Sequence, residues 1–172
     1  MRFFVSAPAV AAASLSVLAL LALAAPTQAR DSLGVFGDWG AFRDAEVPRC
    51  YAIAAAQVSS NSRDLEPFAS VGTWPDRQVR GQIHFRLSRE MRDDSSAILR
   101  IGTASFDLTG SGGDAWAADQ QMDAQIIAAI RAAGSMQVSA SDSRARRFTD
   151  RYALDGAATA MDAATVACSQ NR

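Results

Sequence analysis

The feature that most constrains this chain is an alternation of apolar and polar residues along "QVRGQIHFRLS", positions 78–88. The apolar residues hold the odd positions and are Val79, Gly81, Ile83, Phe85 and Leu87. Arg80, His84 and Arg86 hold even positions. Successive side chains of a β-strand point to opposite faces, so this stretch predicts a strand with one apolar and one hydrated face.

Further alternating stretches indicate several more strands. They lie at 97–101, 104–108, 135–141 and 148–154, and Gly102-Thr103 separates the first two. Sheets whose two faces differ this strongly are usually antiparallel. The segment "LTGSGGDAW" predicts a glycine-rich hairpin turn, and the polar, proline-containing stretch 59–77 predicts a long loop.

Two stretches have helical rather than strand periodicity. Residues 119–133 begin with acids and stop before Gly134, as helices with a favourable dipole and a glycine stop do. An alanine-rich stretch follows Gly156, and its spacing turns Cys168 toward the interior. We therefore expect a mainly β fold: an antiparallel β-sandwich or partly closed barrel of six to eight strands, with two helices packed at its side.

The first 29 residues have the layout of a secretory signal peptide. Arg2 precedes an apolar run, and Pro26 precedes a small-residue ending at Ala29. A membrane anchor and a different cleavage site are the alternatives, although the run falls short of the roughly 18 to 20 residues that a span requires. We expect residues 30–172 to form one exported domain in the periplasm or outer envelope of a Gram-negative bacterium, not spanning the membrane after cleavage.

Charge argues against nucleic acid as a partner. The chain has 17 Lys plus Arg, none of them lysine, and 18 Asp plus Glu. Removal of Arg2 with the leader leaves a net charge of 16 − 18 = −2, and phosphate binding requires a basic excess. We expect no nucleic-acid partner.

The chain has two cysteines, Cys50 and Cys168. In an exported protein such a pair persists as a disulfide, so we expect this bond; two buried free thiols or an intermolecular link are the alternatives. The bond would join an early strand to the last helix.

Little in the sequence points to catalysis. His84 is the single histidine, no metal-ligand spacing appears, and we expect no metal or other cofactor. Arg80, His84 and Arg86 share one face of the predicted strand and form our candidate binding face, with an ordinary hydrated face as the alternative. A small periplasmic hydrolase-like enzyme would use His84 with carboxylates such as Asp38 or Asp107.

Short motifs near both ends resemble the invasion-associated locus B family, exported proteins of Gram-negative bacteria. The first is Phe36-Gly37-Asp38-Trp39, followed by Cys50. The second is the Asp-x-Tyr-x-Leu-x-Gly-x-x-x-Ala tail, here Asp150, Tyr152, Leu154, Gly156 and Ala160. Members commonly have a cysteine where this chain has Arg43, so Cys50 lacks that local partner and remains available to Cys168.

The resemblance implies a compact, β-rich, non-catalytic envelope protein, with some relatives in pathogens linked to host-cell entry. It implies no catalytic residues. We therefore expect an exported protein that acts by binding an unknown protein or envelope component.

Overall fold

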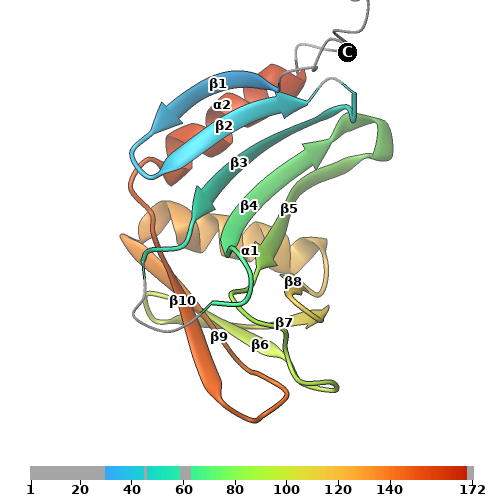
Figure 1. Ribbon diagram of the computed structural model, residues 1–172. Coiled ribbons are helices and arrows are strands. Elements are labelled where there is room, and N and C mark those ends of the chain that lie inside the picture. The colour runs from blue at the N-terminus through green and yellow to red at the C-terminus, as the bar shows by residue number, and fades with distance from the viewer. Residues whose placement is uncertain (1–29, 45, 59–62, 170–172) are drawn as a thin grey trace, which may run out of the picture.

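The protein is described from a computed structural model that covers residues 30–44, 46–58 and 63–169 (Figure 1). The predicted signal peptide lies outside these residues. The strands are β1 (Asp31–Phe36), β2 (Trp39–Asp44), β3 (Arg49–Ala55), β4 (Phe68–Trp74), β5 (Val79–Arg86), β6 (Ala97–Ile101), β7 (Ala104–Ser111), β8 (Asp114–Trp116), β9 (Ser135–Ser141) and β10 (Arg147–Ala153). The helices are α1 (Gln120–Ala132), α2 (Ala157–Ser169) and the short 3₁₀ helix η1 (Pro75–Arg77).

All ten strands belong to one antiparallel sheet in the order β1-β2-β3-β4-β5-β8-β7-β6-β9-β10. The sheet does not close into a barrel, and β1 and β10 are its edges. The prediction of a mainly antiparallel β fold with two helices is confirmed. The predicted strand number was too low, and the prediction of one long loop over 59–77 was wrong, because this stretch contains β4 and η1. Alanine, glycine and serine in β4 hid its alternation.

The two helices lie on one side of the sheet (Figure 1). Helix α2 packs on β1, β2, β3 and β4, while α1 packs on β5 and β7 and touches α2. Helix α1 starts where Asp119 caps it, with the Asp119 carboxylate accepting a hydrogen bond from the Met122 N–H at 2.7 Å. No helix in the described part of the chain is long and apolar enough to cross a membrane.

A large core fills the space between the sheet and the helices, and a smaller cluster surrounds Cys50 and Cys168. Its fully buried large side chains come from both halves of the sheet and from α1, and include Trp39, Ile83, Phe85, Leu99, Ile126, Val138 and Tyr152. Burial of apolar area on this scale is the main source of folding free energy.

The predicted disulfide is present. Cys50 of β3 is bonded to Cys168 of α2, and their Cα atoms are 5.8 Å apart. The two cysteines are 118 positions apart in sequence, so the bond fixes the end of the last helix to the early part of the sheet.

Candidate functional site

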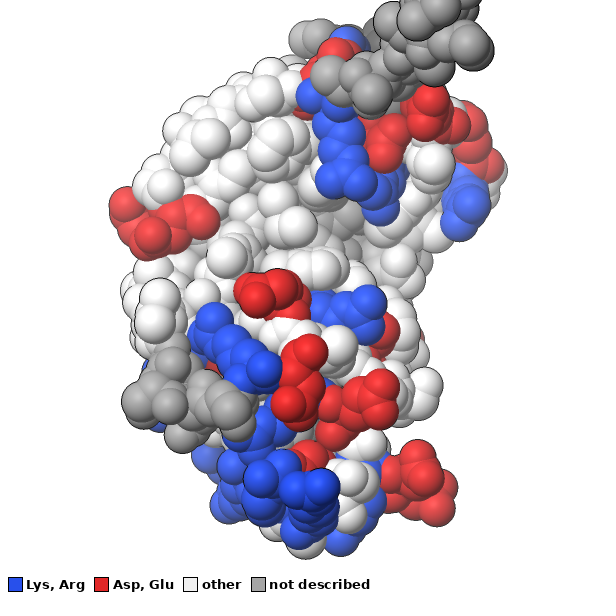
Figure 2. Space-filling model, in the orientation of Figure 1, with Lys and Arg blue, Asp and Glu red and all other residues white. Residues whose placement is uncertain are grey.

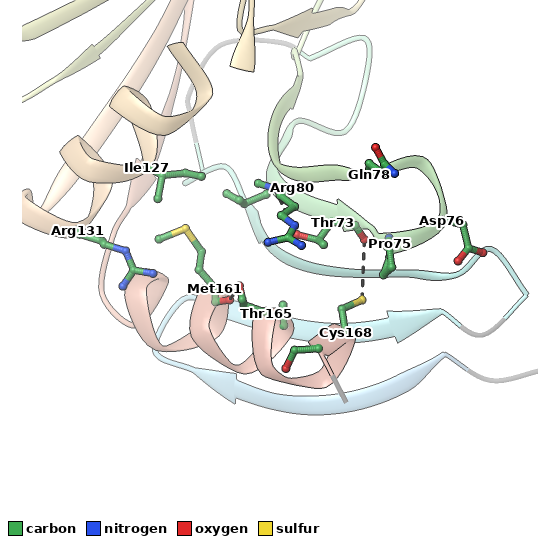
Figure 3. Close-up of a pocket in the computed structure, with 14 residues that line it drawn as sticks. Thr73, Pro75, Asp76, Gln78, Arg80, Ile127, Arg131, Met161, Thr165 and Cys168 are labelled. Atoms are coloured by element: carbon green, nitrogen blue, oxygen red, sulfur yellow. Dashed lines mark hydrogen bonds between the residues drawn. The ribbon is translucent and has the colours of Figure 1, made fainter. Parts of the chain in front are cut away.

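A pocket of about 820 Å³ lies between the β4–β5 hairpin and the two helices (Figure 3). Both helices, both strands and η1 contribute to its wall. The lining residues are Val71, Thr73, Pro75, Asp76, Gln78, Arg80, Gly81, Ile127, Arg131, Met161, Ala164, Thr165, Cys168 and Ser169. Its volume lies in the range of roughly 300 to 1,000 Å³ that is usual for small-molecule sites.

An irregularity in β5 brings Arg80 to this pocket. Gly81 has a φ of +68°, and the pairing of β4 with β5 shifts register between Gly72 and Trp74. This bulge interrupts the alternation of faces. Arg80 therefore lies on the helix side, together with Val71 of β4, while His84 lies on the opposite side.

Helix α1 packs against the bulge and bonds to β5 next to it. The φ of +68° at Gly81 favours glycine, and a Cβ atom there would also lie 2.7 Å from the Cδ1 atom of Ile127 in α1. The Asp123 carboxylate of α1 accepts a hydrogen bond from the Ile83 N–H at 2.8 Å. Burial raises the pKa of Asp123, and the bond from Ile83 opposes that rise.

Arg80 is the cation of the pocket that has no carboxylate partner among the described residues. Its side chain is exposed, and within the described ranges it makes no hydrogen bond or ion pair. Arg131, by contrast, donates two hydrogen bonds to Asp162, at 2.6 and 3.3 Å. Figure 3 shows Arg80 reaching from β5 toward α2, with Met161 between it and Arg131, and Asp76 at the other end of the pocket.

The structure brings His84 and Arg86 together but separates them from Arg80. The His84 Nε2 atom and the Arg86 guanidinium both bond to the Asp114 carboxylate, each at 2.8 Å. The His84 ring also stacks on Trp116, with ring centroids 5.2 Å apart, and meets the edge of Phe68. The three-residue face that strand periodicity predicts does not form, because the Gly81 bulge moves Arg80 to the other side.

The side of the sheet turned away from the helices is uncharged over much of β1–β4, and the charges of these strands gather at one end (Figure 2). Asp114 neutralises the charge of Arg86 and also bonds to the His84 Nε2 atom. Neither Asp38 nor Asp107 bonds to His84 in the described chain. The carboxylate that does, Asp114, belongs to the predicted glycine-rich hairpin, a turn whose sequence gave no sign of pairing with β5.

The two short motifs, at residues 36–39 and 150–160, meet in space. The indole Nε1–H of Trp39 donates to the Ala153 carbonyl at 2.9 Å, and the Asp38 N–H donates to the Asp155 carbonyl at 3.2 Å. Gly156 has a φ of +79°, and a Cβ atom there would lie 1.8 Å from the Phe36 carbonyl oxygen. The first motif is therefore the β1–β2 turn, and the second motif closes over it.

The remaining motif residues are structural as well. The buried Asp150 carboxylate accepts a hydrogen bond from the Ser88 N–H at 2.8 Å, and Tyr152 packs its ring beside Phe85. Leu154 and Ala160 are core residues. None of these side chains lines the pocket, so the motif residues maintain the fold and lie apart from the candidate site.

The fold and the pocket define an open antiparallel β protein with one helix-covered face and a ligand-sized pocket under its helices. Within residues 30–44, 46–58 and 63–169, no three His, Cys, Asp or Glu side chains gather in a way that could hold a metal ion. Comparisons with protein-family models, with curated proteins and with solved structures find no match to this chain.

Sequence reasoning missed most of the pocket. Arg80 was a candidate for the wrong reason, and Ile127, Arg131 and Thr165 were not candidates at all. These residues belong to two helices and are far apart in sequence, so only their packing on the sheet brings them together.

Proposed function

We propose that this chain is an exported, non-catalytic binding protein of the bacterial envelope, of the invasion-associated locus B type, and that its ligand binds in the pocket under α2. The leader-like first 29 residues and the Cys50–Cys168 bond support export, because disulfides persist in oxidising compartments. The two motifs support the family.

The observation that carries the proposal is the pocket itself. It has the volume of a small-molecule site, and its wall combines apolar side chains with Arg80, a cation that has no partner in the described chain. The outer face is the weaker candidate, because Asp114 already neutralises the charge of Arg86 and bonds to His84.

A neutral fluorescent probe, N-phenyl-1-naphthylamine, tests whether the pocket accepts an apolar ligand. Thr165 is exposed and lines the pocket, so Thr165→Trp should place an indole in the opening without disturbing the core. Val166 is 53% exposed on the same helix and does not line the pocket, so Val166→Trp is the matched control.

We expect saturable probe binding that Thr165→Trp weakens by roughly tenfold or more and Val166→Trp leaves unchanged, because only the first indole occupies ligand volume. Absence of saturable binding, or equal binding by both variants, would show that this pocket is not the ligand site.

A further inference from the structure

We infer that the pocket binds an amphipathic carboxylate, a ligand with one anionic head group and an unbranched apolar chain. This inference rests on the proposed function and specifies its ligand class. It follows from three features: the unpaired Arg80, the placement of the other charges, and the apolar residues between them.

The first feature is the guanidinium of Arg80. Its planar fork of N–H donors matches a carboxylate in a bidentate arrangement. The Gly81 bulge directs this side chain into the pocket instead of onto the hydrated outer face. Within the described ranges, no protein oxygen accepts a hydrogen bond from the Arg80 guanidinium. The guanidinium is therefore available to a ligand.

The second feature is the position of the other charges. Arg131 lines the same pocket, and its partner Asp162 is 61% exposed, so water screens that ion pair and it is weak. In Figure 3 Asp76, the acidic residue of the lining, lies at the end of the pocket away from Arg131, and Arg80 lies between the two. The part of the pocket from Arg80 to Arg131 is thus the one suited to an anionic head group.

The third feature is the surface between the charges. Val71, Ile127, Met161 and Ala164 provide apolar wall, and Met161 has a flexible thioether that adapts to an irregular chain. A hydrocarbon tail gains free energy from such a wall in proportion to the apolar area it buries. Ligands with several phosphates would require more cations than Arg80 and Arg131 supply.

Isothermal titration calorimetry with dodecanoate, below its micelle concentration, tests the inference on the oxidised protein without its leader. The comparison ligand is 1-dodecanol, which has the same chain and no charge. Arg80→Gln removes the cation and keeps an exposed polar side chain. Arg77→Gln is the matched control, because Arg77 is exposed, lies three positions away and does not line the pocket.

We expect the wild-type protein and Arg77→Gln to bind dodecanoate about 10- to 100-fold more tightly than dodecanol, the range for a charge-assisted hydrogen bond. Arg80→Gln should lose that preference and keep its affinity for dodecanol. Equal binding of acid and alcohol by the wild-type protein would overturn the carboxylate inference and leave the proposed pocket intact.

A second outcome is that neither dodecyl ligand binds while the wild-type protein still binds N-phenyl-1-naphthylamine and Thr165→Trp weakens that binding. This result would overturn the carboxylate inference and leave the proposed pocket intact. Failure of the neutral probe as well would remove the pocket as a ligand site. Dodecyl phosphate, run in parallel, distinguishes a carboxylate preference from a general anion preference. Tighter binding of the phosphate would overturn the assignment to carboxylates.

Discussion

Gly156→Ala tests the junction at which the β10–α2 connection closes over the β1–β2 turn. Alanine disfavours the φ of +79° found here, at a cost of about 1 to 2 kcal/mol. Its Cβ would lie 1.8 Å from the Phe36 carbonyl oxygen and 2.2 Å from the Phe36 carbonyl carbon. Real Cβ atoms do not approach backbone atoms so closely, and the contact is between two main-chain segments, so one segment must move.

That movement separates two hydrogen-bonded pairs. The Asp38 N–H loses the Asp155 carbonyl, and the indole of Trp39 loses the Ala153 carbonyl. Each bond contributes about 1 kcal/mol. Together with the backbone term, the substitution should lower the free energy of unfolding by about 3 to 4 kcal/mol, a large share of the roughly 5 to 15 kcal/mol of a typical domain.

Gly102→Ala is the matched control. Gly102 has a φ of +56°, and a Cβ there would have no atom within 4 Å, so only the backbone term of about 1 to 2 kcal/mol applies. Urea unfolding followed by tryptophan fluorescence and circular dichroism gives both free energies. If Gly156→Ala falls within about 1 kcal/mol of Gly102→Ala, the steric argument for this junction is refuted.

Two further perturbations act on the disulfide and on a buried carboxylate, Asp142. Replacing Cys50 and Cys168 together by alanine should lower the free energy of unfolding by about 4 to 5 kcal/mol in the chain-entropy model, because the bond closes a loop across 118 positions. Urea unfolding of the oxidised wild-type protein and of the double variant measures this difference. Equal stability of the two proteins would contradict the prediction. Asp142 is the second: burial opposes its ionisation, yet hydrogen bonds from the Arg146 N–H and side chain and from the Arg144 N–H lower its pKa to about 2. A carboxyl with a lowered folded-state pKa stabilises the fold above its unfolded pKa of about 3.9 and loses that contribution as the pH falls through the folded value. Asp142→Asn should therefore be less stable than wild type at neutral pH and lose less stability between about pH 4 and pH 2, whereas parallel acid unfolding profiles would count against it.

Local patterns were enough to predict most elements of the fold. The alternation around Ile83 predicted β5, and the acids and glycines that bound 119–133 predicted α1 to within a residue at each end. Burial of one face is what these patterns encode, so they identify an element wherever that face is clearly apolar. Strand β4 was not predicted because small residues take the place of large apolar ones there. Strand β1 was not predicted either; it is an edge strand whose side chains are all exposed or half-buried.

The candidate site was harder to predict, for a geometric reason. A bulge changes which face of the sheet the neighbouring side chains occupy. A single glycine at position 81 inside an alternating run does not show whether a bulge is present or which side chain it moves. The position of Arg80 depends on Ile127 and Asp123 of a helix about 40 residues later in the chain. Packing between distant segments determines that position, so periodicity within one strand could not predict it.

The junction between the two motifs also governs when folding can finish. The hydrogen-bond acceptor of the Trp39 indole lies 114 positions later in the chain, and the disulfide partner of Cys50 lies 118 positions later. While the ribosome is still making the chain, the first hairpin has neither partner, and contacts between such distant residues form slowly. The early strands therefore gain these two stabilising contacts only after almost the whole chain has been translated.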